Sequence, residues 1–291
     1  MWEHLQIELY KVFKRPRTYL SFAAITALIG VIQLGLWVDG KEYADFVMAD
    51  FASSFSVDGK ILNGYFICYV ILQLLLVHVP LLIALIAADM ISGEANMGTL
   101  RLLMTKPQSR TSIVLAKFLA SSIYTVLLLI WIAIMGLFLS MLIFGTDDLF
   151  LMKSSYVVIV KESDVFWRYA GAFCFAALAM ITVAALGFLL SFFAENSIGP
   201  IVATMSVIIV STILSTMNIP LFNLIKPYLF TTHMITWKEF FDFKVNDANE
   251  AIIGSIQNPQ KIVQSASILF IHIVLFVGTA IALFRKKDIL S

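Results

Sequence analysis

The chain has 291 residues, of which 60% are hydrophobic and 13% are charged. Soluble globular proteins average roughly 45–50% apolar and about 25% charged residues, so this chain cannot cover its apolar surface with polar groups. The formal net charge of +1 gives no general attraction to nucleic acid. The composition excludes an ordinary soluble domain and favours a polytopic membrane protein whose general partner is membrane lipid.

The first predicted unit, 1–18, is an amphipathic helix at the cytoplasmic membrane surface. Apolar residues recur at helical spacing at Trp2, Leu5, Leu9, Val12 and Phe13. The opposite face carries charged residues, which are Glu3, Glu8, Lys11 and Lys14. Pro16 ends this pattern before the first apolar run. Two roles stay open, a passive anchor and a sleeve that couples the first span to a cytoplasmic partner.

The second unit, 19–291, contains six apolar runs that are long enough to cross a membrane. A spanning helix needs about 20 mostly apolar residues. The runs are 19–38, 65–88, 113–144, 169–193, 199–217 and 267–284. The third is too long to cross perpendicularly, so it must tilt or project, and we expect the excess at the Lys117 end. These runs predict an all-α membrane fold with six transmembrane helices.

Short basic segments predict the orientation, because Lys and Arg near helix ends stay on the cytoplasmic side. They precede the first span, separate the second from the third, and follow the sixth: Lys11, Lys14, Arg15 and Arg17; Arg101, Lys106, Arg110 and Lys117; Arg285, Lys286 and Lys287. Both termini are therefore expected in the cytoplasm of a cell whose inner (plasma) membrane holds the chain. The outer loops are then 39–64, 145–168 and 218–266.

The last outer loop, 218–266, is the longest, and its first part is strongly apolar. Residues 219–243 are interrupted by Pro220 and Pro227 and are too short to span. They predict short helices that dip into the outer leaflet or pack on the bundle. An aromatic belt at the interface is an equal alternative.

The loop 89–112 carries the most informative local pattern. Gly93 and Gly98 lie in a polar turn, and Thr99 is a suitable N-cap for a short apolar helix that Pro107 ends. Ser109 and Thr111 are candidates to cap the next span. Arg110 lies where lipid headgroups or an acidic partner would be met.

These residues resemble the conserved cytoplasmic loop of type-2 ABC transporter permeases. The likeness rests on Glu94, Gly98, Thr99, Leu100, Leu102, Leu103, Pro107, Ser109 and Arg110. Residues 284–289 resemble the family's usual C-terminal end, and the six-span layout extends the likeness over nearly all of the chain. The absence of a large outer domain is similar to permeases of bacterial peptide-antibiotic and cation exporters.

The resemblance implies a permease subunit that forms the translocation path of an exporter. The 94–105 part of the loop would be a coupling helix seated in a groove of a separate ABC ATPase, with a second contact at Glu195. ATP and Mg²⁺ would bind to that ATPase, leaving no cofactor on this chain. A second permease copy, or a homologous permease, would complete the path. An ordinary positive-inside connector is the alternative for the loop.

Catalytic motifs are missing from the sequence. There is no G-x-x-x-x-G-K-[ST] string for phosphate binding, no HExxH and no GxSxG. Cys68 and Cys174 lie in apolar runs, where a thiol behaves as a small hydrophobic group. We therefore expect a non-catalytic chain without a metal site.

Two histidines, His78 and His272, lie inside predicted spans. Contact with the transport path or a proton is one interpretation, and a packing hydrogen bond to a neighbouring helix is the favoured one. A secondary transporter or channel is the alternative function. It would require intramembrane acids or broken helices in paired positions, and the runs contain no Asp or Glu beyond Asp89 at the end of the second.

Overall fold

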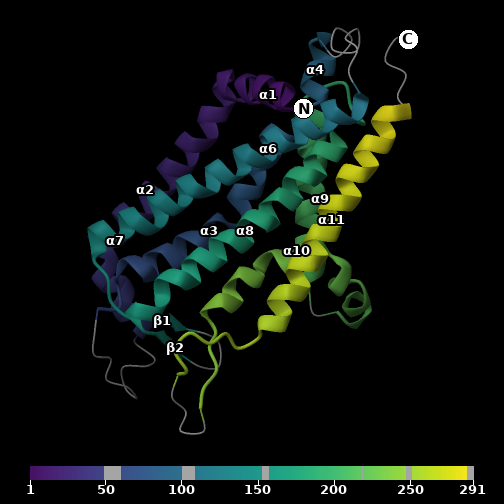
Figure 1. Ribbon diagram of the computed structural model, residues 1–291. Coiled ribbons are helices and arrows are strands. Elements are labelled where there is room, and N and C mark those ends of the chain that lie inside the picture. The colour runs from purple at the N-terminus through teal and green to yellow at the C-terminus, as the bar shows by residue number, and fades with distance from the viewer. Residues whose placement is uncertain (49–59, 100–108, 153–156, 218, 247–250, 287–291) are drawn as a thin grey trace.

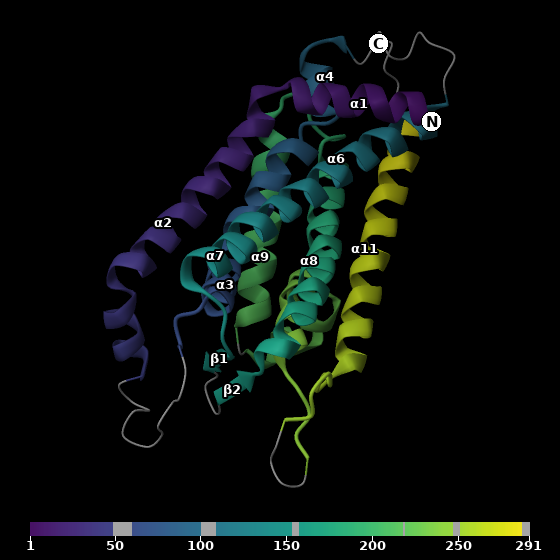
Figure 2. The same cartoon turned by 60° about the vertical axis from the view of Figure 1, so that its left-hand side comes forward.

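This computed structural model describes residues 1–48, 60–99, 109–152, 157–217, 219–246 and 251–286. Its long helices form a bundle, with α1 (Trp2–Lys14) lying across one end and a two-stranded hairpin at the other (Figures 1 and 2). We call the end with α1 the terminal end, because Met1 and the end of α11 (Pro259–Lys286) both lie there, and we call the opposite end the hairpin end. Both ends of the described chain lie at the same end of the bundle because the number of spans is even.

Six candidate membrane spans confirm the predicted fold class. They are Pro16–Gly40 within α2 (Pro16–Met48), α3 (Gly64–Ala87), Arg110–Phe144, α8 (Glu162–Leu190), α9 (Ile198–Thr216) and α11. The fourth begins at Glu162 instead of 169, and the sixth begins at Pro259 instead of 267. The last outer loop is therefore shorter than the predicted 218–266.

The break between α1 and α2 lies at Arg15, whose backbone is extended (φ −81°, ψ 130°). Pro16 then starts α2, since a proline at the first helical position loses no intrahelical bond. The Thr18 hydroxyl donates a hydrogen bond to the Val12 carbonyl across the bend. α1 buries Leu5, Glu8 and Val12, so Glu8 does not lie on a solvated face as the sequence pattern indicated. The location of α1 at a membrane surface stays a prediction.

The third span is not one regular helix. α6 (Arg110–Ala133) passes through a π turn at Ile134–Phe138 into α7 (Leu139–Phe144). The buried Gln33 amide of α2 donates to the Met135 carbonyl (2.8 Å) and to Ser140 Oγ (2.9 Å) beside this turn. α7 meets the start of α3 closely, because a Cβ on Gly64 would lie 2.4 Å from the Met141 Cα.

A β-hairpin at the hairpin end is the element that the all-α prediction missed. β1 (Leu149–Met152) pairs antiparallel with β2 (Val157–Val160), with Leu149 opposite Val160. One face of β2 is buried and the other exposed, as alternation along a strand requires.

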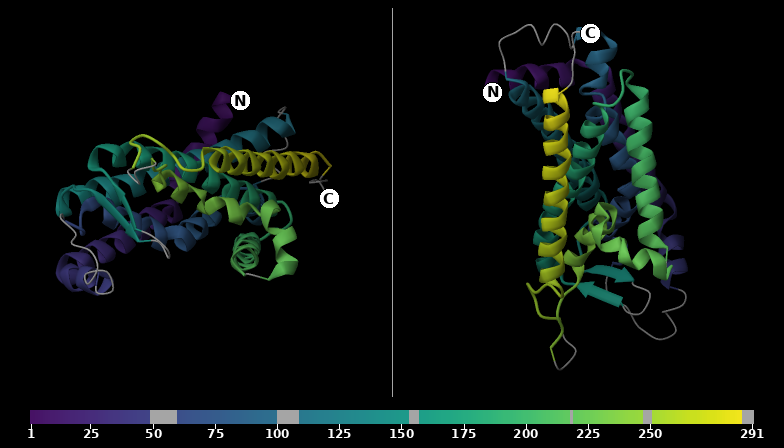
Figure 3. Two further views of the ribbon diagram at one scale, coloured as in Figure 1. Left: turned by 90° about the horizontal axis from the view of Figure 1, so that it is seen from below. Right: turned by 90° about the vertical axis from the view of Figure 1, so that its right-hand side faces the viewer.

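The apolar segment after α9 packs on the bundle. It comprises 3₁₀ turns at Pro220–Leu224, Lys226–Tyr228 and Ile235–Phe241 (η4), with α10 (Phe230–Met234) between them. These turns lie beside α11 and between it and α9 in Figure 3. Trp237 and Phe241 are buried, and the ring centroids of both lie 5.4 Å from that of Tyr69 in α3. The predicted short helices are confirmed, and they pack against the bundle.

A buried ion pair holds the next part of this connection. Arg168 is 0% exposed and binds Asp164 Oδ2 at 2.6 Å, one helical turn earlier in α8. Its guanidinium also donates to the carbonyls of Phe240 (2.6 Å) and Ser255 (2.8 Å). The sequence analysis assigned both charged residues to a loop. The carbonyl groups that bind Arg168 belong to a segment far away in sequence, so a local pattern could not show them.

Candidate functional site

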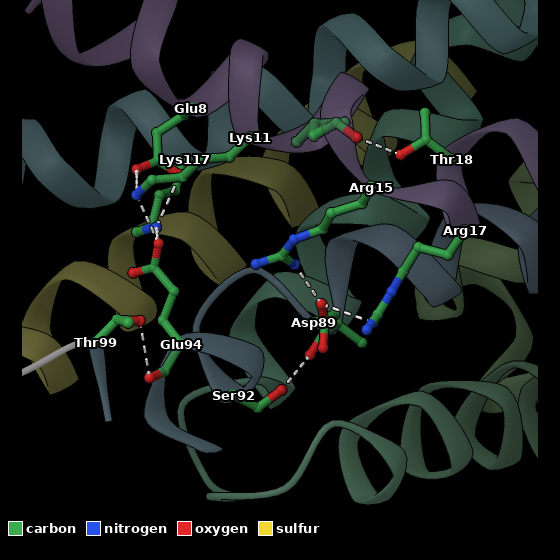
Figure 4. A network of polar contacts seen from close by, with 12 residues as sticks. Glu8, Lys11, Arg15, Arg17, Thr18, Asp89, Ser92, Glu94, Thr99 and Lys117 are labelled. Atoms are coloured by element: carbon green, nitrogen blue, oxygen red, sulfur yellow. Dashed lines mark hydrogen bonds and ion pairs between the residues drawn. The ribbon is translucent and has the colours of Figure 1, made fainter. Parts of the chain in front are cut away.

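At the terminal end, α1 is held against the rest of the bundle by a closed ring of four charged side chains (Figure 4). Lys11 Nζ lies 2.8 Å from Glu8 Oε1 and 2.8 Å from Glu94 Oε1. Lys117 Nζ lies 2.8 Å from Glu8 Oε2 and 2.8 Å from Glu94 Oε1. Each carboxylate therefore contacts both ammonium groups, and α1, α4 (Ser92–Asn96) and α6 share one charge-balanced cluster.

The ring is largely withdrawn from solvent. Lys117 is 0% exposed, Glu94 4% and Glu8 6%. A charge at such a place is tolerated when it is paired, and the loss of one partner leaves the others uncompensated. The contacts of the ring therefore depend on one another.

The pKa values of Glu94 and Lys11 follow from these contacts. Burial raises the pKa of Glu94, but the charge of Lys117 and hydrogen bonds from Lys11 and Lys117 outweigh it, and the net pKa is lowered. Burial lowers the pKa of Lys11, but hydrogen bonds to Glu8 and Glu94 raise it overall. Both groups are consequently charged at neutral pH.

A second charged contact ties the α1–α2 junction to the end of α3. Arg15 Nη1 and Arg17 Nη1 lie 2.6 Å and 2.7 Å from Asp89 Oδ2, and Asp89 is 1% exposed. The carboxylate also packs against Gly93, where an added Cβ would lie 2.5 Å from Asp89 Oδ1. The glycine is therefore needed for the close approach.

The sequence pattern predicted a polar turn at Gly93 and Gly98, whereas the structure has Gly93 inside α4 and Gly98 in the turn that follows the C-cap Met97. Gly98 has φ +69°, a conformation that L side chains rarely adopt, and its N–H donates to the Ala95 carbonyl (3.0 Å). The Thr99 hydroxyl donates to the Glu94 carbonyl (3.3 Å). Met97, Gly98 and Thr99 are exposed. The other predicted coupling residues, Leu100, Leu102, Leu103 and Pro107, lie outside the described residues.

Arg110 joins the start of α6 to the end of α11. Its Nη1 donates to the carbonyls of Phe284 (3.1 Å) and Arg285 (3.1 Å). Arg285 Nη2 in turn donates to Thr111 Oγ1 (2.9 Å), so Thr111 serves this contact instead of a cap. Ser109 is the N-cap of α6, since its hydroxyl accepts the Ser112 N–H (3.2 Å).

The remaining candidate residues lie apart from the ring. Glu195 is exposed on the connection between α8 and α9. His78 is exposed, and His272 is half-buried. The Nδ1 atoms of these histidines lie 3.0 Å from the Leu74 carbonyl and 2.8 Å from the Ile268 carbonyl, each in the histidine's own helix. The favoured interpretation was a hydrogen bond to a neighbouring helix, whereas in the structure each histidine bonds within its own helix.

Three members of the ring, Glu8, Lys11 and Lys117, were not predicted as site residues, although the sequence carried a signal for two of them. Glu8 lies three residues after Leu5 and four before Val12, on the face that α1 buries. Lys117 lies inside an apolar run, where an ionisable residue usually serves a function. Within the described part of the chain, no group of three or more His, Cys, Asp and Glu is placed to hold a metal ion.

Comparison with known sequences places this arrangement in a family. The sequence model for ABC-2 family transporter proteins matches residues 8–289, which include the ring and all six spans. This chain belongs to the ABC-2 transporter family. As an ABC-2 permease, it is a multi-pass membrane component of an ABC transporter.

A relative of the ABC-2 permease is YhcI of Bacillus subtilis (strain 168), which is described as an uncharacterized protein. The two are 25% identical over 212 residues, which cover 70% of this chain and 63% of YhcI. The chain thus matches less than two thirds of the length of that relative.

Proposed function

We propose that this ABC-2 permease forms the translocation path of an exporter and is coupled to separate ATPase subunits through the loop 94–105. The observation that carries the proposal is the ring of Glu8, Lys11, Glu94 and Lys117. It fixes the first residue of that loop to α1 and to the third span.

Coupling requires that ATP-driven changes in the ATPase alter the relative stability of two permease states, which happens through contacts that differ between the states. A helix as short as α4 is not stable alone, since helix nucleation is unfavourable. Here it is held by the ring and by the hydrogen bond from the Gly93 N–H to the Asp89 carbonyl (3.0 Å). A displacement of the loop would therefore move α1 and α6 with it.

The proposed assembly contains two ATPase subunits, which bind ATP and Mg²⁺, and a second permease copy or a homologous permease. Its terminal end would lie in the cytoplasm, with the chain in the inner membrane. Arg15, Arg17, Arg110 and Arg285 gather at this end, which supports the orientation through the positive-inside rule.

Co-purification with a candidate ATPase from a neighbouring reading frame tests the proposal. Gly98→Pro removes the N–H that bonds Ala95 and imposes a negative φ where the chain needs +69°. Leu103→Asp places a charge in the predicted contact. Both variants should insert normally yet lose most of the bound ATPase or its stimulation by the permease.

Gly98→Asn is the matched control, because asparagine tolerates the left-handed conformation better than other residues. It should retain ATPase binding. Wild-type levels of bound and stimulated ATPase in both Gly98→Pro and Leu103→Asp would reduce the loop to a connector.

A further inference from the structure

We propose that the outer edge of the β-hairpin binds an extended peptide segment of a partner, which adds to β2 as a further strand. The site is a slot of about 760 Å³ at the hairpin end, between β2 and residues 242–245 (Figure 1). Its volume is within the range of about 300–1,000 Å³ that is typical of ligand sites. Consecutive residues line it on both sides, 157–159 on β2 and 242–245 on the facing segment.

The slot runs along the edge of β2. Successive side chains of a strand point to opposite faces, so contact with Val157, Val158 and Ile159 together places the slot at an edge and not over one face. β1 pairs with the other edge and does not line the slot. Towards the slot, β2 has no backbone hydrogen bond to another described residue. Because every second residue of an antiparallel strand points its N–H and C=O away from the paired strand, this edge offers free donors and acceptors.

The facing segment, 242–245, is paired elsewhere. The Asp242 carbonyl accepts the Gln257 N–H at 2.9 Å. The Lys244 carbonyl accepts the Ile252 N–H at the same distance. These bonds hold the segment to residues 252–257 instead of to β2, so it forms a wall of the slot and leaves the β2 edge open.

The β2 edge lacks the features that commonly protect a strand from pairing with another chain, which are lysine, proline and bulges. All four of its residues are apolar and β-branched, and its register with β1 is unbroken. Val157 and Ile159 are 39% and 41% exposed, whereas Val158 and Val160 are buried. An added strand would cover the two exposed side chains with its own alternate side chains. The edge therefore selects an extended segment with an apolar residue at every second position.

Lys244 adds a preference for negative charge. It lines the slot and is exposed, and among the described residues no carboxylate is paired with its ammonium group. Asp242, the other charged residue of the wall, is 7% exposed. The accessible charge of the wall is thus positive, which favours an acidic group beside the apolar stretch of the peptide. Residues 157–160 of a second copy offer no acid to Lys244, so the charge favours a peptide over a β2–β2 contact between copies.

The side of the membrane on which the peptide binds rests on the proposed function, because the hairpin end is outside only in the proposed orientation. Binding to the purified chain depends on neither the ATPase nor the orientation. A failure of the site and a failure of coupling are therefore distinguishable.

Anisotropy of synthetic peptides with a neutral fluorophore tests the site on the full chain in nanodiscs. The probe is a short capped peptide of alternating Val and Thr that ends in Asp. Matched peptides have Asn in place of Asp, or N-methyl groups on all Val or on all Thr residues, which removes the donors of one edge or the other. We expect saturable binding that Asn weakens by a few fold, the effect of one exposed ion pair. One of the two N-methylated peptides should bind at least about tenfold more weakly, because its main chain loses the hydrogen bonds to β2.

Variants of the chain test the edge and the charge separately. Ile159→Lys introduces the protective lysine at an exposed position and should abolish binding. Ile253→Lys is the matched control, because Ile253 is 68% exposed and does not line the slot, and it should bind the peptide as wild type does. Lys244→Gln should remove the preference for Asp over Asn. Thermal unfolding at the wild-type temperature shows that each variant is folded.

Three results would overturn the proposal: no saturable binding, equal binding of both N-methylated peptides and the parent peptide, or undiminished binding in folded Ile159→Lys. A fourth is a chain that binds no peptide and forms a disulfide-linked dimer through Ile159→Cys, with Cys68 and Cys174 replaced. That result would assign the β2 edge to a second copy of this chain.

Discussion

Glu94 and Lys117 show how strongly a buried charge depends on its partners. If Glu94 is neutralised, Lys117, which is 0% exposed, keeps only the Glu8 carboxylate as a partner. We predict that Glu94→Gln lowers the free energy of unfolding by about 3 kcal/mol, the magnitude typical of a broken buried ion pair. The exposed Glu195 provides the matched control, and Glu195→Gln should change stability by less than about 0.5 kcal/mol.

The same residue predicts a pH dependence. Because the folded-state pKa of Glu94 is lowered, the unfolded chain binds the proton more tightly. The stabilisation is fully present above the ordinary glutamate pKa of about 4.3 and is lost as pH falls through the lowered value. Thermal unfolding from pH 7 downward should show a steeper acid limb in wild type than in Glu94→Gln. Parallel acid limbs would contradict this account.

The histidines differ in burial, which predicts different consequences of replacement. His233 is 8% exposed, with Nδ1 3.0 Å from Ser265 Oγ and Nε2 2.9 Å from the Pro227 carbonyl. His233→Phe should therefore destabilise the protein by about 1–3 kcal/mol, since it removes two hydrogen bonds of a buried side chain. His78→Phe and His272→Phe should assemble normally and change ATPase stimulation by no more than a few fold. Abolished transport in either of those two variants, with normal assembly, would instead indicate a role in the transport path.

At the scale of elements, the junction of α3 and α4 depends on the absence of a side chain at Gly93. Gly93→Ala would push its methyl group into the Asp89 carboxylate and so weaken the contacts to Arg15 and Arg17. We predict faster tryptic cleavage after Lys14 and Arg17, because α1 would separate from the bundle more often. Gly35→Ala is the control, since nothing lies within 4 Å of a Cβ there. Equal cleavage rates for the two variants would show that Asp89 does not anchor this junction.

The six spans were predictable because a membrane-crossing helix is a continuous apolar run in the sequence. The start of α8 was not predictable, since Asp164 and Arg168 are typical loop residues. Their place in a helix depends on their ion pair and on hydrogen bonds from Arg168 to the carbonyls of Phe240 and Ser255. The ring has the same origin: Glu8, Glu94 and Lys117 are far apart in sequence, and their pairing is set by tertiary packing. Gly98 was recognised from local turn chemistry alone, because its requirement is a backbone angle.

For the whole molecule, the orientation in the membrane follows from where the described ends lie. We predict that a single cysteine at Asn96 is cytoplasmic and one at Thr146 is outside, in a background with Cys68 and Cys174 replaced. Both positions are exposed, and they belong to the terminal and hairpin ends. An impermeant thiol reagent applied to intact cells should label position 146 and leave position 96 unlabelled until permeabilisation. The reverse pattern would invert the topology.

The whole account depends on the terminal end being the surface that meets an ATPase. Met97 ends α4 next to Gly98 and is 59% exposed, so a photoreactive amino acid there should leave the ring intact. We predict that irradiation of the assembled transporter links position 97 to the ATPase subunit, while the same amino acid at Thr146 gives no such product. A transporter that co-purifies with its ATPase but is cross-linked from position 146 and never from position 97 would contradict the proposed coupling.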